Sequence, residues 1–113
     1  MVERWVPGRG DVAWLDLSPR VGHEQSGRRP ALILSPAGYN GLVGMALACP
    51  ITSQVKGYPF EVAIPEGLKV TGVVLSDQVR SFGWRARNAT FICPLPAEVV
   101  TQVFLKLRSL LPQ

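Results

Sequence analysis

Histidine and cysteine are scarce in this 113-residue sequence, which has one His and two Cys and no uncharged apolar run of transmembrane length. So few ligating side chains form no cluster with metal-site spacing, and we expect neither a metal ion nor another cofactor. Cys49 and Cys93 both stand in apolar surroundings, which favours buried free thiols over a disulfide. Residues 1–5 contain no apolar signal core, so we expect a soluble cytoplasmic protein with no membrane segment.

Acidic residues are outnumbered by basic ones. Twelve Lys and Arg against eight Asp and Glu give a formal net charge of +4, which modestly favours a polyanionic partner such as nucleic acid or an acidic protein segment. The composition, with 47% hydrophobic residues, 11 Gly and 10 Pro, is that of an ordered protein with many turns. The length fits one domain, residues 1–113.

Short apolar segments bounded by Gly and Pro predict a mainly β protein. Residues 11–17 alternate polar and apolar side chains, and residues 29–35 and 45–49 are continuous apolar runs typical of strands buried on both faces. We expect these two runs at the sheet centre, the second ending at Pro50. Four more strands are predicted at residues 60–64, 72–76, 78–82 and 90–93. Strands at this spacing indicate a small barrel or sandwich.

One amphipathic helix is predicted over residues 96–111, where apolar side chains recur at intervals of three and four. Pro96 suits its first turn and Pro112 ends it. Residues 35–44 read as turns with room for one helical turn that starts at Pro36.

The only histidine lies beside a carboxylate and two guanidinium groups in GHEQSGRRP, residues 22–30. Its two glycines allow a sharply turning loop, whereas Pro30 forces Arg29 into an extended conformation at the start of a strand. Without further information, Glu24 and Arg29 could form an ordinary surface ion pair and His23 could simply be solvated.

Arginines and aromatic residues are interleaved in RSFGWRAR at residues 80–87. This mixture can hold phosphates and offer rings to unstacked bases, although an edge strand with a solvated face would look the same. Two smaller polar clusters stand where predicted strands end, TSQ with Lys56 at residues 52–56 and Asp77-Gln78 with Arg80.

On these residues the chain resembles the MazF/PemK family of toxin endoribonucleases. The resemblance is carried by GDVAWLD at residues 10–16, GHEQSGRRP at 22–30, SPAGYN at 35–40, PITS at 50–53, KGYPFEV at 56–62, DQVRS at 77–81 and WRAR at 84–87. These motifs run nearly end to end without long insertions, and the MazF branch is the closer one.

The resemblance implies an SH3-like, partly open small barrel with a C-terminal α-helix, the PemK/CcdB-like toxin fold. It also implies a homodimer that cuts single-stranded mRNA at specific sequences without a metal, and a cognate antitoxin that neutralises it. An acidic, disordered C-terminal antitoxin segment would suit a basic groove, because it can mimic the charge of the RNA and fold as it binds.

The family's active positions correspond here to Glu24, Arg29 and Thr52, and the PemK-like branch adds His23 and Asp77 as further catalytic candidates. That branch has an arginine where this chain has Leu75. The residues expected to contact RNA are Trp14, Arg28, Ser53, Lys56, Gln78, Arg80, Trp84, Arg85 and Arg87.

The chemistry suits the three active positions. Cleavage through the RNA's own 2'-OH needs a base for that hydroxyl, cations for the crowded phosphate and a proton for the leaving 5'-oxygen. Glu24 is the available base, Arg29 a planar fork for phosphate oxygens, and Thr52 a hydroxyl donor. A guanidinium does not release its proton in proteins, so the general acid stays open between His23 and water. The expected products are a 2',3'-cyclic phosphate and a 5'-OH end.

Two other functions fit parts of the sequence. A toxin of similar fold poisons DNA gyrase by binding through an apolar or aromatic C-terminal tip, whereas this chain ends in LLPQ without an aromatic residue. An RNA-binding module without catalysis is the second alternative. The presence of Glu24 and Arg29 favours the enzyme over the gyrase poison.

Overall fold

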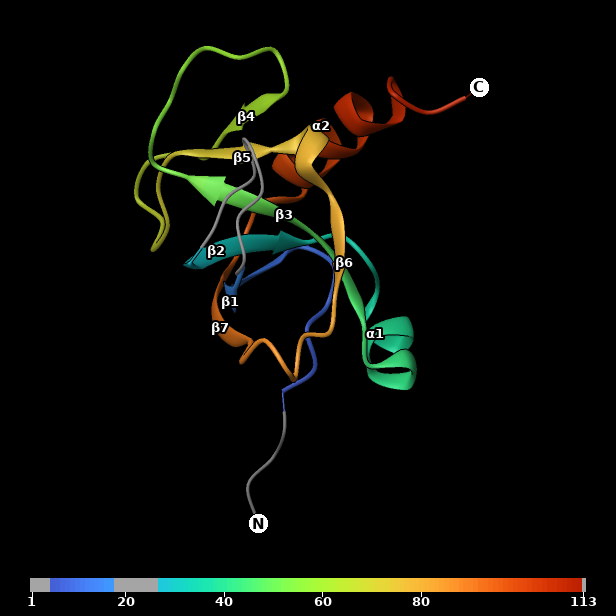
Figure 1. Cartoon of the computed structure of the whole chain (residues 1–113). Coiled ribbons are helices and arrows are strands. Elements are labelled where there is room, and N and C mark those ends of the chain that lie inside the picture. The colour runs from blue at the N-terminus through green and yellow to red at the C-terminus, as the bar shows by residue number, and fades with distance from the viewer. Residues whose placement is uncertain (1–4, 18–26, 113) are drawn as a thin grey trace.

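Seven strands, one 3-10 turn and two α-helices make up residues 5–17 and 27–112, the part of the chain that this computed structural model describes. In chain order the elements are β1 (Asp11–Asp16), β2 (Arg28–Ile33), α1 (Ala37–Val43), β3 (Ala46–Thr52), β4 (Glu61–Ala63), β5 (Val73–Leu75), η1 (Ser76–Gln78), β6 (Arg80–Phe82), β7 (Thr90–Pro94) and α2 (Ala97–Arg108). A mainly β fold with a C-terminal helix is therefore confirmed (Figure 1).

The described strands pair antiparallel in the order β4-β5-β3-β2-β1-β7, and β6 pairs with a separate stretch of β3. This path runs between two edge strands, β4 and β7, so the sheet curls into a barrel that stays open. The two continuous apolar runs form β2 and β3, and their central places in the order confirm what their composition predicted.

The central sheet buries both faces because successive side chains of a strand point to opposite sides. Leu32 of β2 packs toward α2, in a core that includes Val99, Val100 and Val103 of that helix. Ala31 and Ile33 of the same strand belong to the other core, with Leu15, Phe82 and Trp84. Burial of β2 on both faces begins only at Ala31, since Arg28 and Arg29 before it are exposed.

Pro50 does not end a strand, contrary to the expectation from sequence, because β3 continues through it to Thr52. Along its outer side β3 pairs with β6 at residues 46–48 and with β5 at residues 51–52. Pro50 therefore falls in the gap between these two partners, where its missing N–H interrupts no ladder. The added residues carry Thr52 to the rim of the barrel.

The helices and the segment before β6 also differ from the predicted boundaries. Residues 76–78 form η1, so Ser76 and Gln78, which were predicted in strands, lie in a 3-10 turn with Asp77. α2 ends at Arg108, because Ser109 bonds back to the Lys106 carbonyl oxygen at 2.6 Å and Pro112 disfavours helix at the residue before it. α1 begins at Ala37, one residue after Pro36. Neither helix in the described residues is long and apolar enough to cross a membrane.

Cys49 and Cys93 are both buried and free, as their apolar surroundings predicted. Burial raises the pKa of the Cys49 thiol to about 12, and the negative charge of Asp77 adds to the shift. This thiol therefore stays protonated and packs as a small apolar side chain.

Candidate active site

Two hollows flank the rim of the barrel where β3 ends. The first, here called the arginine cleft, has a volume of about 390 Å³ and is lined by Trp14, Arg28, Arg29, Pro30, Ile51, Ser53, Lys69, Val70, Thr71 and Ile92. The second, here called the threonine pocket, has a volume of about 450 Å³ and is lined by Thr52, Gln54, Lys56, Tyr58, Glu61, Leu75, Asp77 and Gln78. Thr52 and Ser53 are consecutive, so the end of β3 separates the two hollows.

The sheet register brings Arg29 and Thr52 to the same end of the β2–β3 pair. Ala31 is the partner of Pro50, and Arg29 and Thr52 each lie two positions beyond that rung. Two positions along a strand restore the same face, so both side chains start from one side of the sheet. The fold therefore brings two of the three expected catalytic positions to one rim, where Arg29 lines the arginine cleft and Thr52 lines the threonine pocket.

The arginine cleft combines cations with an exposed aromatic ring. Trp14 of β1 is 41% exposed, and Arg29 at the start of β2 is exposed beside it. Lys69, from the turn between β4 and β5, is also exposed and lines the same cleft together with Ser53. The cleft thus offers positive charge for phosphate and an indole face for a base.

Thr52 is held tightly at the rim and is 6% exposed. Its Oγ1 accepts a hydrogen bond from the Gln54 backbone N–H at 3.1 Å. The backbone of Gly72 lies against it, since a Cβ added at Gly72 would come within 2.1 Å of the Thr52 carbonyl oxygen. The hydroxyl keeps its own proton, which it can donate to a phosphate oxygen in the threonine pocket.

Asp77 is engaged within the fold rather than free in the threonine pocket. The Tyr58 hydroxyl donates to its Oδ2 at 2.7 Å, and its Oδ1 is buried without a hydrogen-bond partner. The bond to Asp77 raises the pKa of the Tyr58 hydroxyl, so the phenol remains a donor at neutral pH. In this conformation Asp77 has no exposed oxygen without a partner with which to begin proton transfer.

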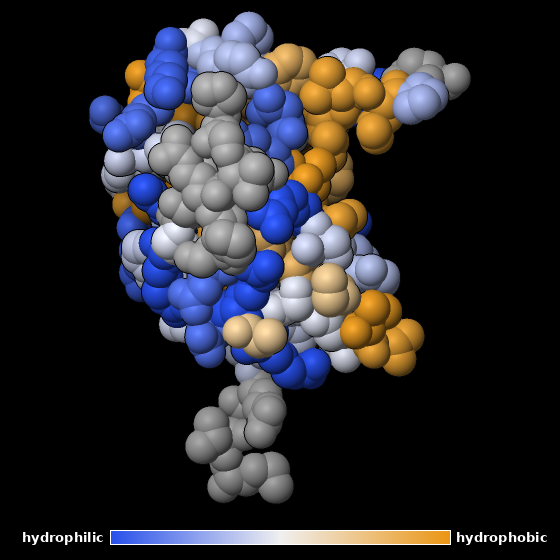
Figure 2. All heavy atoms as spheres, in the orientation of Figure 1, coloured by the Kyte–Doolittle hydropathy of each residue, from blue (hydrophilic) through white to orange (hydrophobic). Residues whose placement is uncertain are grey.

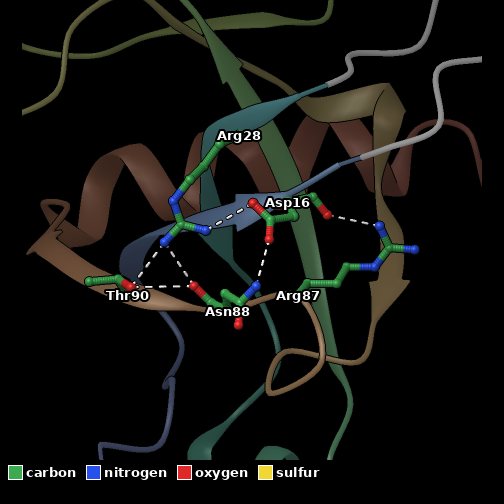
Figure 3. A network of polar contacts seen from close by, with 5 residues as sticks. All are labelled: Asp16, Arg28, Arg87, Asn88 and Thr90. Atoms are coloured by element: carbon green, nitrogen blue, oxygen red, sulfur yellow. Dashed lines mark hydrogen bonds and ion pairs between the residues drawn. The ribbon is translucent and has the colours of Figure 1, made fainter.

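Arg28 was expected to contact RNA, but its guanidinium is occupied by the protein. Nη1 donates to Asp16 Oδ1 at 3.0 Å, and Nη2 donates to the Asn88 carbonyl oxygen at 2.9 Å and to Thr90 Oγ1 at 3.0 Å (Figure 3). Sequence could not show this, because the acceptors come from β1, from β7 and from the turn before β7. Arg28 therefore has a structural role, and because it also lines the arginine cleft its contact with RNA stays a prediction.

Trp84 does not offer its ring to RNA, which corrects the expectation from the RSFGWRAR segment. The ring is 5% exposed, and its Nε1–H donates to the Asn40 carbonyl oxygen at 3.0 Å in the second core. Arg85 lies over Trp84, with its Cζ 4.2 Å from the ring centroid. An alternating pattern of Arg and aromatic residues cannot by itself distinguish a stacking platform from a capped core residue.

The remaining arginines of that segment also have partners. Arg80 and Arg87 both lie over Phe82, at 5.0 Å and 5.2 Å from the ring centroid, and Arg87 donates to the Asp16 carbonyl oxygen at 2.8 Å. Arg80 is partly exposed beside η1, whereas Arg87 braces the end of β1.

Glu24 and His23, the expected base and a candidate acid, lie outside the described residues. The described ends on either side of them meet, because the Leu17 backbone N–H donates to the Gly27 carbonyl oxygen at 2.8 Å. Within residues 5–17 and 27–112, no group of three or more His, Cys, Asp or Glu side chains could hold a metal ion.

Lys69 and Tyr58 were not among the residues expected at the site. Lys69 lies in a turn without a matching motif, so only the fold brings it to Arg29. Tyr58 belongs to the KGYPFEV motif, and that motif was the one signal that could have pointed to it. Glu61 of the same motif accepts the backbone N–H groups of Lys56 and Gly57, at 3.0 and 3.1 Å, and so pins the loop that presents Lys56 and Tyr58.

Comparisons with known proteins agree on one family. Residues 8–111 match the PemK-like, MazF-like toxins of type II toxin-antitoxin systems. The chain is 54% identical over 90 residues to the endoribonuclease toxin MazF of Escherichia coli strain K12, covering 80% of each chain. It is 33% identical over 107 residues to the Escherichia coli endoribonuclease PemK, covering 91% of this chain and 80% of PemK.

Solved structures give the same result. The crystal structure of MazF from Deinococcus radiodurans has a TM-score of 0.91 and 54% identity, covering 95% of this chain and 97% of that one. A MazE–MazF crystal structure from the same organism has a TM-score of 0.87 and 54% identity, covering 95% and 96%. The partly open barrel with its C-terminal helix is therefore a fold shared with these toxins.

Proposed function

The chain belongs to the PemK-like, MazF-like toxin family of type II toxin-antitoxin systems, and from that premise we propose that it cuts single-stranded mRNA at specific sequences. It is an endoribonuclease toxin, neutralised by an antitoxin. The observation that carries the finer proposal is the arginine cleft, where Arg29, Lys69 and the exposed ring of Trp14 surround one hollow beside Thr52. We also propose that residues 1–113 form one toxin domain that acts in the cytoplasm.

The proposed reaction uses the 2'-OH of the RNA as the nucleophile. Glu24 takes the proton of that hydroxyl, the 2'-oxygen attacks the phosphorus, and the bond to the 5'-oxygen breaks. Arg29 and the Thr52 hydroxyl stabilise the extra negative charge on the phosphate oxygens. The leaving 5'-oxygen takes a proton from His23 or water, which leaves a 2',3'-cyclic phosphate and a 5'-OH. Neither a metal ion nor a protein nucleophile takes part.

Cleavage of a labelled single-stranded RNA in the presence of EDTA tests this function. We expect cutting at a short recurrent sequence, with products that carry the two ends named above. Tight binding without cutting would instead indicate an RNA-binding module. No binding and no cutting would contradict both functions. The gyrase alternative is not supported, because the relatives described above are endoribonucleases.

The salt dependence of RNA binding should depend on the lysines at the rim of the barrel. Each phosphate that a lysine neutralises releases counterions and adds roughly 0.7 to the slope of log K against log salt for single strands. We expect Lys69→Gln and Lys56→Gln each to lower the slope by about that amount, measured by fluorescence anisotropy at several salt concentrations. The comparison variant is Lys106→Gln on α2, a residue that lines neither hollow. Because Lys106 Nζ donates to the Pro59 carbonyl oxygen, the unfolding midpoint of this variant is measured as well. Equal slopes in all four proteins would move the RNA path away from this rim.

The antitoxin is proposed to occupy the same cleft as the RNA. A MazE–MazF complex is known for Deinococcus radiodurans. An acidic, disordered C-terminal segment can place carboxylates near Arg29 and Lys69 and an apolar side chain against Trp14. We expect this segment of the cognate antitoxin to displace labelled RNA competitively in a titration. Simultaneous binding without mutual weakening would contradict shared occupancy and require a separate site.

A homodimer is proposed to form through the apolar side of the molecule. Figure 2 shows hydrophobic residues gathered along one side, by α2 and α1. Among the large apolar residues exposed there are Tyr39, Leu42, Val43, Leu47, Leu105, Leu110 and Leu111. These residues are grouped on one side and are not scattered singly, which suits a symmetric contact between two copies of the chain. Analytical ultracentrifugation measures this directly, and a sedimenting mass of one chain at micromolar concentration would contradict it.

A further inference from the structure

Next to the arginine cleft, a network of polar contacts joins the end of β1, the start of β2 and the segment that leads into β7 (Figure 3). Asp16, the last residue of β1, uses both carboxylate oxygens, since Oδ1 accepts from Arg28 Nη1 at 3.0 Å and Oδ2 accepts from Asn88 Nδ2 at 2.8 Å. Its backbone is engaged as well. The Asp16 N–H donates to the Arg87 carbonyl oxygen at 3.0 Å, and the Asp16 carbonyl oxygen accepts from Arg87 Nη1 at 2.8 Å.

The network lies on the last rungs of the β1–β2 ladder, where Leu15 is opposite Arg29 and Asp16 is opposite Arg28. The next pair, Leu17 and Gly27, is hydrogen-bonded. Antiparallel pairs alternate, so Asp16 and Arg28 form a non-hydrogen-bonded rung, in which side chains lie closest to each other. This geometry favours a side-chain ion pair at that rung.

The first residues of β2 need such support because they are paired on one side only. Pairing of β2 with β3 begins at Ala31, and Pro30 has no N–H to extend it. The backbone of Arg29 therefore pairs with β1 and not with β3, two rungs from the Leu17–Gly27 end of the ladder, and strands open most easily near such ends. Arg28 links this end to β7 through the Asn88 carbonyl oxygen and Thr90 Oγ1.

The network adds little to the free energy of unfolding of the protein. The Arg28 and Asp16 side chains are 39% and 42% exposed, and an exposed ion pair contributes little to stability. The network instead fixes the orientation of the Arg28 side chain, because a planar guanidinium that donates to three acceptors cannot rotate freely. Hydrogen bonds from Asn88 and Arg28 also lower the pKa of Asp16, so the carboxylate is charged at neutral pH.

We propose that Asp16 is a positioning residue for RNA cleavage, acting through Arg28 to hold the neighbouring Arg29 in register at the cleft. This inference rests on the proposed function, because it assigns Arg29 to the phosphate. Asp16 itself does not touch the RNA. Its loss lets the end of β2 open and moves the Arg29 guanidinium away from the charge that develops in the transition state.

The test exchanges the two partners of one hydrogen bond. Asp16→Asn leaves one acceptor oxygen for two donors, Arg28 Nη1 and Asn88 Nδ2, and Asn88→Asp puts two carboxylates face to face. The double variant Asp16→Asn/Asn88→Asp restores one donor and one acceptor, and Asp at position 88 tolerates the positive φ of 56° found for Asn88. The matched control is Asp11→Asn, the same change at the opposite end of β1.

Single-turnover cleavage of one labelled RNA is measured with its dissociation constant and the thermal unfolding midpoint of each protein. We expect each single variant to cut about tenfold more slowly with an RNA Kd within about twofold of wild type, since small misplacements act on the chemical step. The double variant should recover most of the rate, and Asp11→Asn should match wild type.

Wild-type rates in both single variants would overturn the positioning role. Equal losses in rate, RNA affinity and unfolding midpoint, with no recovery in the double variant, would also overturn it and indicate a purely structural network. A wild-type protein that cuts no RNA would instead contradict the proposed function, which separates the two failures.

Discussion

Replacing Arg29 or Glu24 with alanine is expected to lower the rate of RNA cleavage by at least about a hundredfold. That is the usual cost of losing a group that stabilises charge in a transition state, as proposed for Arg29, or a general base, as proposed for Glu24. Arg29 lies exposed at the start of β2 and lines the arginine cleft, so its removal leaves both cores intact. The unfolding midpoint of the Arg29→Ala variant should therefore stay close to that of wild type. Single-turnover cleavage, with circular dichroism as the check on folding, measures both quantities.

A second change at the same position separates charge from shape. Arg29→Lys keeps the positive charge but loses the planar fork that can bind two phosphate oxygens at once. We expect a rate between those of wild type and Arg29→Ala. If Arg29→Ala cut RNA at nearly the wild-type rate, Arg29 would have no part in the mechanism, and Lys69 would be the next candidate for the phosphate.

Replacing Gly72 with alanine is expected to lower the free energy of unfolding by about 3 kcal/mol or more, through steric clash added to backbone strain. Gly72 has a φ of +105°, and an added Cβ would lie 2.1 Å from the Thr52 carbonyl oxygen and 2.9 Å from the Ser53 Cα. These are backbone atoms of the β3 rim, which can give way only by moving Thr52. Cleavage should fall together with stability.

Gly67 provides a matched control in the same turn between β4 and β5. Its φ is +91°, but an added Cβ has no atom within 4 Å. Gly67→Ala therefore carries the strain of positive φ without the clash, and we expect it to cost roughly 1 kcal/mol. Urea unfolding of both variants measures the difference. Equal costs would mean that Gly72 is required for its φ alone and not for its close approach to Thr52.

The sequence was informative wherever the physical cause lies within a few neighbouring residues. The apolar runs that became β2 and β3 have to be buried on both faces, so their place at the sheet centre followed from composition. The helical period after Pro96 predicted α2 for the same reason. Arg29 was also predictable, because Pro30 restricts it to the extended backbone of a strand start.

Predictions failed where the partner of a side chain comes from a distant part of the chain. Arg28 and Arg29 are adjacent and chemically identical and both line the cleft, yet the Arg28 guanidinium is held by Asp16, Asn88 and Thr90, which no local pattern predicts. Pro50 interrupts no strand pairing, because it lies in the gap between the part of β3 that pairs with β6 and the part that pairs with β5. No local pattern contains either fact.

The sequence by itself therefore determined a mainly β toxin fold with a C-terminal helix, and the residue types that RNA cleavage requires, because burial and backbone preference are local properties. Only the tertiary structure decided which of those residues meet. Sheet register carries Arg29 and Thr52 to one end. The packing of α1 and of the turns against the sheet buries Trp84 on Asn40 and brings Lys69 to the cleft. Register depends on pairing between residues far apart in the chain, and hydrogen bonds and ion pairs across strands depend on register.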